Sequence, residues 1–248
     1  MPTLLLVRHG RSSANTSGVL AGRTPGVQLD DTGRSQVAAL AERLAPVPLV
    51  AVVSSPLERC VATAEAVRAV AGPRGKWRHR PDLELDERLS ECDYGEWTNR
   101  PLRDLAKEPA WAVVQQHPSA AAFPGGETLR GVQARALEAV RETDERVRRE
   151  HGEAAVWCAV SHGDVIKAVL ADALGMHLDA FQRVVVDPAS LSVVRYTPTR
   201  PFVLRTNDTA GSTDALVPAR RRRGRRDAVS SGDAVVGGGA GADPAPRG

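Results

Sequence analysis

Two histidines stand at the ends of short apolar segments, and a glycine follows each of them. His9 comes after the apolar residues 3–7, and His162 comes after the apolar residues 154–160. Runs of this length are typical of buried strands, and open α/β sheets place their ligands beyond the carboxyl ends of strands. Both ends would lie at the same edge of a parallel sheet. We therefore expect the two imidazoles to converge.

Two arginines are expected at the same edge. Arg8 directly precedes His9, and Arg59 lies on the helix that should follow a further apolar run at residues 49–53. A guanidinium group remains charged at any working pH, and its fork of N–H donors matches phosphate oxygens. Two imidazoles and two guanidinium groups around one point indicate a site for a phosphoryl group. The structural alternative is a buried network of ion pairs with Asp or Glu.

Histidine chemistry at such a site would also need a proton donor. Neutral imidazole is a good nucleophile near pH 7, because its reference pKa is about 6.5. The alkoxide that leaves when phosphorus is attacked must be protonated. The segment after the strand expected at residues 78–85 offers four candidate carboxylates, Glu87, Glu91, Asp93 and Glu96. Their spacing does not choose among them.

Alternating strands and helices are expected to position these residues. Strands are predicted at residues 3–7, 49–53, 78–85, 154–160, 191–196 and 202–204. Helices are predicted at residues 32–44, 56–71, 127–151 and 164–174, with a polar loop at residues 88–100 and short helices after it. This order predicts an α/β fold, a three-layer α/β/α sandwich around a mainly parallel central sheet.

The composition is ordinary for one globular domain. The 248 residues are 42% hydrophobic and 25% charged, which is enough to bury a sizeable core. The formal net charge of +3 comes from residues 211–248, which hold seven Arg and four Asp, whereas residues 1–210 carry equal numbers of basic and acidic side chains. A basic fold surface for nucleic acid is therefore not expected.

The end of the sequence differs from the rest in composition. From residue 207 onward, Gly, Ala, Pro, Asp and Arg dominate, and large apolar side chains are few. Such a segment cannot bury enough surface to offset its ordering entropy. We predict one domain at residues 1–206 and a disordered tail at residues 207–248. The arginine run at residues 220–226 is basic enough to attract nucleic acid or anionic lipid, but a solvated tail is the favoured interpretation.

Cysteine and histidine spacing argues against disulfides and metal sites. The three cysteines, Cys60, Cys92 and Cys158, are far apart and show no paired spacing of the kind found in zinc sites. The remaining histidines, His79, His117, His151 and His177, share no segment, and none of them pairs with another at helical spacing around a Glu. We expect no metal.

The first apolar run bears on localisation. It spans residues 4–7 and is ended by Arg8 and His9. It is too short for the core of a signal peptide or for a membrane span. We expect a cytoplasmic protein without membrane contact, acting as a monomer or a homodimer.

Four segments of the sequence resemble the histidine phosphatase superfamily, which includes the cofactor-dependent phosphoglycerate mutases. They are Leu6-Val7-Arg8-His9-Gly10, Ser54-Ser55-Pro56-Leu57-Glu58-Arg59-Cys60 with Thr63-Ala64, Gly125-Gly126-Glu127-Thr128, and Ser161-His162-Gly163. They occur in that family's order, and the resemblance extends over roughly residues 3–204. It implies a phosphoglycerate mutase-like fold.

The resemblance also implies how the clustered residues act. His9 would attack phosphorus and become phosphohistidine. The charge on the phosphoryl oxygens would be held by Arg8, Arg59 and His162, and for this His162 must be cationic or at least a donor. Among the four carboxylates, the one that matches the family's acid is Glu91. It would protonate the leaving oxygen and then deprotonate the water that attacks phosphohistidine.

Further positions are implied to bind the substrate. They are Arg8, Gly10, Asn15, Gly22, Arg59 and Gly163. Where relatives commonly carry Glu or Gln after Arg-His-Gly, this sequence has Arg11. Arg11 and Arg23 are predicted to meet a second acidic group of the substrate, with a solvated surface charge as the alternative for Arg11.

We predict a metal-independent phosphatase that hydrolyses small phosphorylated metabolites and needs no cofactor. A phosphomutase would share the first half-reaction, but it would retain the phosphoryl group and require a bisphosphate primer. Only 70 residues separate Glu91 from His162, which leaves out segments that the classical mutases of the family insert there. This favours hydrolysis. A third possibility is a non-catalytic regulator that binds phosphorylated ligands through the arginine pair.

Overall fold

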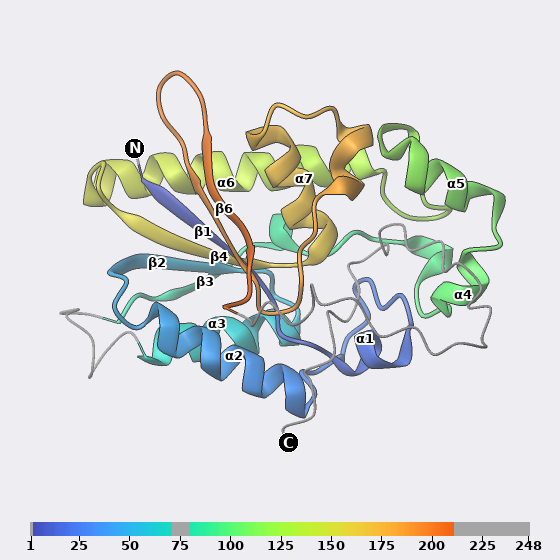
Figure 1. The fold of residues 1–248 in the computed structure, drawn as a ribbon, viewed down its shortest axis with the longest axis horizontal. Helices are drawn as coiled ribbons and strands as arrows, with labels where there is room; N and C mark the ends of the chain where they lie inside the picture. The colour runs from blue at the N-terminus through green and yellow to red at the C-terminus, as the bar shows by residue number, and fades with distance from the viewer. Residues whose placement is uncertain (1, 71–79, 211–248) are drawn as a thin grey trace, which may run out of the picture.

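The computed structural model describes residues 2–70 and 80–210, which form a single sheet between two layers of helices (Figure 1). The strands are β1 (Thr3–Arg8), β2 (Leu49–Ser54), β3 (Leu83–Leu85), β4 (Val156–Ser161), β5 (Leu191–Arg195) and β6 (Phe202–Asp208). Their order across the sheet is β3-β2-β4-β1-β5-β6. The first four strands in this order are mutually parallel, β5 pairs antiparallel with β1, and β6 pairs antiparallel with β5 at the edge of the sheet. The predicted α/β sandwich with a mainly parallel sheet is confirmed.

The long helices cover both faces of the sheet. They are α2 (Asp31–Leu44), α3 (Glu58–Val70), α6 (Leu129–His151) and α7 (Gly163–Ala173). In Figure 1, α6 and α7 lie above the sheet and α2 and α3 lie below it. Shorter helices are α1 (Ser13–Ser17), α4 (Leu102–Leu105) and α5 (Pro109–Gln116), with 3-10 turns η1 (Glu87–Leu89), η2 (Gly95–Trp97), η3 (Pro118–Ala120) and η4 (Leu178–Arg183).

Strand alternation divides the core into two halves. On β1, Leu4 and Leu6 pack among residues of α6 and α7, whereas Leu5 and Val7 pack among residues of α2 and α3. A strand buried on both faces reads as a continuous apolar run, which is why residues 3–7 look uniform in the sequence.

The predicted boundaries differ from the observed ones at several places. α6 begins at Leu129, not at residue 127, because the Thr128 hydroxyl accepts a hydrogen bond from Gly131 N at 3.0 Å and caps the helix. β3 is confined to Leu83–Leu85, and the part of the predicted strand at residues 78–79 lies outside the described residues. The loop predicted at residues 88–100 contains η2 and the end of η1.

The sheet continues past the predicted end of the domain at residue 206. β6 runs through Asp208, because Asn207 N bonds to the Ser192 hydroxyl at 3.1 Å and Asp208 forms an ion pair with Arg43 at 2.8 Å. These two residues belong to the fold and not to the tail. Residues 211–248, which hold the rest of the predicted tail and its arginine run, lie outside the described part of the chain.

None of the helices in the described residues combines the length and apolar character needed to cross a bilayer.

Candidate active site

The two predicted histidines lie side by side at the carboxyl ends of β1 and β4. These strands pair in parallel with Arg8 opposite Ser161, so the residues that follow them are brought together. The His9 amide donates a backbone hydrogen bond of 3.1 Å to the Ser161 carbonyl. The ring centroids of His9 and His162 are 5.1 Å apart, with an interplanar angle of 63°. The imidazoles converge as predicted.

The His9 ring is oriented by its neighbour in sequence. Nδ1 lies 2.7 Å from the Gly10 carbonyl oxygen, which can only accept, so Nδ1 carries the proton and Nε2 presents a lone pair. Burial lowers the pKa of His9 well below its usual value, and the positive charges of Arg59 and Arg8 lower it further. The ring is therefore neutral near pH 7, with a nucleophilic nitrogen facing the interior of the site.

Arg59 bridges the two histidines from the start of α3. Its Nε lies 3.3 Å from His9 Nε2, and its Nη2 lies 3.3 Å from His162 Nδ1 and donates to the Gly22 carbonyl at 2.8 Å. Its Nη1 is buried and has no hydrogen-bond partner among the described residues. A buried guanidinium nitrogen without an acceptor is costly unless a ligand supplies one. An anion beside His9 Nε2 would do so.

His162 is held from its other side. Nε2 lies 2.8 Å from the Ser55 hydroxyl and 3.3 Å from the Cys60 sulfur. Because Arg59 can only donate to Nδ1, the proton of the neutral ring is on Nε2. Burial, then the charge of Arg59, then that of His9 and Arg8, lower the pKa of His162 well below its usual value. The predicted cationic form would require an arriving phosphoryl dianion, whose charge favours the imidazolium.

Arg8 is the last residue of β1 and is fully buried. Its Nη1 donates a hydrogen bond of 2.8 Å to the Val186 carbonyl. Burial lowers the pKa of this guanidinium, while the carboxylates of Glu91 and Asp187 act in the opposite direction. Arg8, His9, Arg59 and His162 together are called the cradle below. Each of them has at most 3% of its surface exposed, so any anion they bind is largely shielded from water.

Glu91 is the predicted acid, and the structure buries it at the cradle. Only 4% of its surface is exposed, and its Oε1 accepts a hydrogen bond of 2.9 Å from Cys92 N. Burial, followed by the negative charge of Asp164, raises the pKa of Glu91 to about 7, although Arg59 and Arg8 oppose this. A carboxyl group with this pKa can both give and take a proton near neutral pH. The other three candidate carboxylates do not share this environment.

The loop that carries Glu91 is fastened by an ion-pair network. We call residues 90–94 the acid loop. Glu127 binds Arg135 through both carboxylate oxygens at 2.8 and 2.9 Å, binds Arg23 at 2.9 Å and accepts from Asp93 N at 2.9 Å. Arg135 also donates to the carbonyls of Ser90 at 2.8 Å and Glu91 at 3.2 Å. The network therefore fixes the backbone on both sides of the proposed acid.

A comparison with known protein families decides what kind of protein carries this site. The sequence model of the histidine phosphatase superfamily (branch 1) matches residues 4–209. The chain belongs to the histidine phosphatase superfamily.

Relatives in this superfamily are similar to this chain over most of its length. Phosphoserine phosphatase 1 of Hydrogenobacter thermophilus is 29% identical over 228 residues, covering 89% of this chain and 99% of that protein. The glucosyl-3-phosphoglycerate phosphatase of Mycolicibacterium vanbaalenii is 30% identical, covering 71% and 76%. The solved structure of Bacillus stearothermophilus YhfR has a TM-score of 0.74 at 28% identity, covering 84% and 98%. These findings confirm the predicted family and reaction class, phosphomonoester hydrolysis through a phosphohistidine.

Glycines of this histidine phosphatase allow close packing of neighbouring segments at two positions near the cradle. A Cβ at Gly10 would lie 2.6 Å from the Gly33 carbonyl, and one at Gly22, which has φ +52°, would lie 3.1 Å from the Tyr94 ring. The Gly22 carbonyl is the acceptor that holds Arg59. Gly163 opens α7 directly after His162. Their role as substrate ligands stays a prediction.

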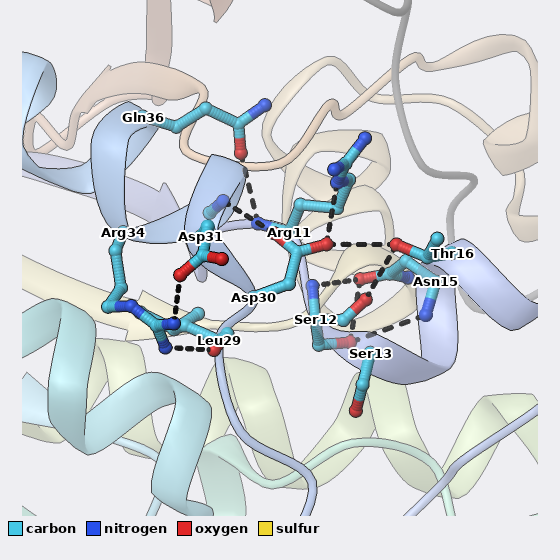
Figure 2. A network of polar contacts seen from close by, with 12 residues as sticks. Arg11, Ser12, Ser13, Asn15, Thr16, Leu29, Asp30, Asp31, Arg34 and Gln36 are labelled. Atoms are coloured by element: carbon cyan, nitrogen blue, oxygen red, sulfur yellow. Dashed lines mark hydrogen bonds and ion pairs between the residues drawn. The ribbon is translucent and has the colours of Figure 1, made fainter.

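Asn15 and Arg11 have structural partners (Figure 2). The Asn15 side-chain oxygen accepts from Ser12 N at 3.0 Å, and the backbone N–H of Asn15 donates to the Ser12 hydroxyl, which completes a capping box on α1. Arg11 donates from Nε to Asp30 at 2.8 Å, and Arg11 N donates to the Gln36 side chain at 3.0 Å. Arg11 therefore anchors the loop before α2. The short helix α1 was not predicted, because it contains no apolar pattern.

Arg23 is also engaged in the protein. It donates to the Glu91 carbonyl at 2.8 Å as well as to Glu127. A second acidic group on the substrate would have to share Arg23 with this network and compete with Asp30 for Arg11. The predicted role of both arginines in substrate binding therefore stays a prediction, while their contacts explain how they order the site.

The sequence alone missed the residues that support the cradle and the acid loop. Ser55 and Glu127 lie within quoted motifs, yet the motifs did not show that one orients His162 and the other holds the acid loop. Asp164 and Lys167 are buried beside the site, on the helix that follows His162. The available signal for Asp164 and Lys167 was their charge at positions of α7 that should face the core.

Potential metal ligands do not cluster in the described part of the chain. No group of three or more His, Cys, Asp or Glu side chains within residues 2–70 and 80–210 has a metal-binding arrangement. The thiols of Cys60, Cys92 and Cys158 are free and buried. Burial raises the pKa of Cys60 and that of Cys158 to about 12, so these thiols stay protonated at neutral pH.

Proposed function

We propose that this histidine phosphatase hydrolyses small phosphomonoesters without a metal, using His9 as its nucleophile and Glu91 as its proton donor. The observation that carries the proposal is the pairing of an unprotonated His9 Nε2 with a buried Arg59 Nη1 that has no partner among the described residues. His9 Nε2 can attack phosphorus while Arg59 Nη1 donates a hydrogen bond to a negatively charged phosphoryl oxygen.

The first half-reaction transfers the phosphoryl group to the protein. The lone pair of His9 Nε2 attacks phosphorus in line, the new N–P bond forms, and the ester P–O bond breaks. The leaving oxygen takes the bonding electron pair together with the proton of Glu91. Because burial and Asp164 raise the pKa of Glu91 to about 7, the carboxyl group holds this proton at neutral pH.

The cradle stabilises the charge on the transferred group. Arg59 and Arg8 supply fixed positive charge, and His162 becomes a second donor once a dianion has raised its pKa. The Gly10 and Gly163 backbones, with Asn15 and Gly22 at the mouth, are proposed to contact the rest of the substrate. Donors fixed by buried contacts need little reorganisation when the charge develops.

The second half-reaction returns the protein to its starting state. Ionised Glu91 takes a proton from water, and the resulting hydroxide oxygen attacks phosphohistidine. The N–P bond breaks, His9 recovers its lone pair and inorganic phosphate is released. The same carboxyl group thus serves as acid and then as base, which a pKa near 7 permits in both directions.

The substrate is proposed to be a small phosphorylated metabolite. Two relatives are named for phosphoserine and glucosyl-3-phosphoglycerate, both of which are phosphomonoesters that also carry a carboxylate.

The site is built on strand ends with one loop over it, and all five proposed catalytic side chains come from one chain. A monomer is therefore sufficient for the chemistry, and a homodimer would not alter it. The free thiols are in keeping with a cytoplasmic location.

The first test is turnover of p-nitrophenyl phosphate by the purified protein and by His9→Ala, each with and without a chelator. We expect chelator-insensitive turnover by the wild type and a loss of at least about 10³-fold in His9→Ala. Acid-labile, base-stable phosphoprotein should accumulate only in the wild type. Chelator-sensitive turnover, or full activity of His9→Ala, would overturn the proposal.

A second assay separates hydrolysis from a mutase reaction, in which the phosphoryl group moves to another hydroxyl of the substrate. The protein is incubated with 3-phosphoglycerate, with and without 2,3-bisphosphoglycerate, and products are followed by ³¹P NMR. Release of inorganic phosphate as the main product supports the hydrolase. Appearance of 2-phosphoglycerate in excess of inorganic phosphate would assign a mutase.

A further inference from the structure

A buried carboxylate that the proposed chemistry does not use stands behind the acid loop. Asp164 is the second residue of α7, two positions after His162, and only 1% of its surface is exposed. Its Oδ2 accepts a hydrogen bond of 2.8 Å from the hydroxyl of Tyr94, which is fully buried. Tyr94 closes the acid loop, three positions after Glu91. Asp164 therefore ties the acid loop to the helix that begins behind the second histidine.

Lys167 lies one turn further along α7. Its Nζ is 3.8 Å from Asp164 Oδ1, and only 3% of its side chain is exposed. The ammonium also donates to the Gln182 side chain at 3.1 Å and lies 5.7 Å from the centre of the Phe181 ring. A buried ammonium needs a nearby carboxylate to stay charged.

Two carboxyl groups share this interior, and their partners differ. Asp164 faces the hydroxyl of Tyr94 and the ammonium of Lys167, whereas Glu91 Oε1 accepts a backbone hydrogen bond from Cys92. Like charges in a low-dielectric interior repel, so the negative charge of Asp164 disfavours the ionised form of Glu91. This repulsion is the second cause, after burial, of the raised pKa of Glu91.

The charged and titratable groups around Glu91 come from several elements. They are Asp164 and Lys167 on α7, Arg59 and Cys60 on α3, Arg8 on β1, Arg135 on α6, Arg23 between α1 and α2, and Cys92 and Tyr94 in the acid loop. Burial raises the pKa values of the two thiols and the phenol, so they are neutral at working pH. The cations favour ionised Glu91. Asp164 opposes them, which makes it the group whose removal should change the acid most.

We propose that Asp164 is a positioning residue for the phosphatase reaction, which seats the acid loop through Tyr94 and keeps Glu91 ready to donate its proton. The inference rests on the proposed function, in which Glu91 protonates the leaving oxygen. Asp164 acts through two side chains of the acid loop and does not touch the substrate.

The test compares pH profiles of kcat/KM for an alkyl phosphate, O-phospho-L-serine, in the wild type, Asp164→Asn and Lys167→Met. Activity of the wild type should fall on the alkaline side near pH 7, where Glu91 loses its proton. Asp164→Asn removes a negative charge, so this limb should move to lower pH by about one unit. Lys167→Met removes a positive charge, so it should move to higher pH. Unmoved or reversed limbs would overturn the proposal.

The hydrogen bond between Tyr94 and Asp164 is tested with Tyr94→Phe. Loss of the hydroxyl leaves Asp164 in place but frees the acid loop, so kcat/KM for phosphoserine should fall about 10-fold more than kcat/KM for p-nitrophenyl phosphate. The nitrophenolate leaves without help from an acid, whereas the serine alkoxide does not. Equal losses on both substrates would show a general structural defect, and Asp164 would then not position the acid loop through Tyr94. This arm also decides the matter if Asp164→Asn does not fold.

Asp144→Asn is the matched control. Asp144 is also a buried carboxylate that accepts from an aromatic side chain, Trp157 Nε1 at 2.9 Å, but Trp157 lies near the opposite end of β4 from His162. It should change stability without moving the pH profile or the ratio between the two substrates. A shift equal to that of Asp164→Asn would mean that any buried carboxylate has this effect.

A measurement without turnover separates this proposal from the proposed function. The carboxyl carbon of Glu91, labelled with ¹³C and assigned by comparison with Glu91→Gln, is titrated by NMR in the wild type and in Asp164→Asn. A lower midpoint in Asp164→Asn supports the link even if the protein hydrolyses neither substrate. An unchanged midpoint rejects the link even if the protein is an active phosphatase.

Discussion

The cradle and the acid loop face the same point, but different interactions hold them there. The cradle histidines follow β1 and β4 directly, and parallel pairing of these strands sets their separation. The acid loop lies between η1 and η2, and its backbone is held by side chains of Glu127 and Arg135. The phosphate-binding half is thus positioned by the sheet, and the proton-transfer half is positioned by ion pairs. The two halves should fail separately when altered.

The largest effect is expected from Arg59→Met, which attacks the cradle. The change removes the donor that contacts His9 Nε2 and the Gly22 carbonyl, together with the buried Nη1. We expect kcat/KM to fall by about 10³-fold for alkyl and aryl phosphates alike, because both transfer the same phosphoryl group. Steady-state kinetics with phosphoserine and p-nitrophenyl phosphate measure this.

Arg68→Met is the control for that experiment. Arg68 lies on the same helix, where it binds Glu65 at 3.0 Å and the Pro81 carbonyl at 3.0 Å. It should retain activity within about twofold, since it lies outside the cradle. If both variants lose activity equally, the loss at Arg59 reflects damage to α3, and the assignment to the cradle fails.

The next largest effect is expected from Glu91→Gln, which leaves the cradle intact. Glutamine keeps the shape of the side chain but cannot give up a proton. Turnover of phosphoserine should fall by about 10²-fold. With p-nitrophenyl phosphate, the rate of the first half-reaction should fall much less. A stopped-flow burst of nitrophenolate followed by slow turnover would show that phosphohistidine forms but is not hydrolysed. Equal loss of the burst and of turnover contradicts the assignment.

A smaller effect is expected from Glu127→Gln, which loosens the acid loop from a distance. The change weakens the contacts to Arg135, Arg23 and Asp93 N without touching Glu91. We expect about a 10-fold loss on phosphoserine and a smaller loss on p-nitrophenyl phosphate. Kinetics on both substrates measure the ratio.

The control for this change is Glu145→Gln. Glu145 also binds an arginine, Arg148, through both oxygens at 2.8 and 2.7 Å, but on the solvent face of α6. It should leave both rates unchanged, because exposed ion pairs contribute little. A double-mutant cycle of Glu127→Gln with Arg135→Met should be strongly non-additive, and additive losses would mean that the two residues act independently.

The same contrast explains what the sequence could predict. The cradle follows from local patterns, because each histidine comes directly after an apolar run and strand pairing does the rest. The acid loop depends on contacts between residues far apart in the chain, such as Asp93 and Glu127, and periodicity carries no information about them. The choice of Glu91 among four carboxylates therefore needed the family resemblance. Its burial beside Asp164 became visible only in the fold.

Arg11 has a structural partner that the local pattern did not reveal. Its place two positions after the nucleophile suggested a substrate ligand, yet Asp30, which caps α2, receives its Nε at 2.8 Å. A charged side chain beside a site finds the nearest opposite charge in the fold, and that partner lies 19 positions away in the sequence. Proximity along the chain therefore did not reveal this partner, and the contact of Arg11 with substrate stays a prediction.

The smallest expected effect concerns stability at mildly acidic pH. Burial holds the pKa of His162 well below its usual value, so the unfolded chain binds a proton at this residue before the folded chain does. Stability from His162 is therefore present above about pH 6.5 and is lost as pH falls below it, at up to about 1.4 kcal/mol per pH unit. Glu91 acts in the opposite direction, because its raised pKa makes the folded state bind a proton first between about pH 7 and 4.5.

His162→Gln separates the two contributions. Urea unfolding at pH 7.5, 6.5 and 5.5 should show that the variant loses less stability on acidification than the wild type, by about 1 kcal/mol over the last pH unit. Glu91→Gln should change the slope with the opposite sign, because it removes the group that gains a proton on folding. Parallel lines for wild type and His162→Gln would mean that folding does not shift the pKa of this imidazole, and a larger loss in the variant would mean that the folded cradle holds it protonated. In that case the arginines do not exclude its charged form, and His162 would be a donor before any phosphoryl group arrives.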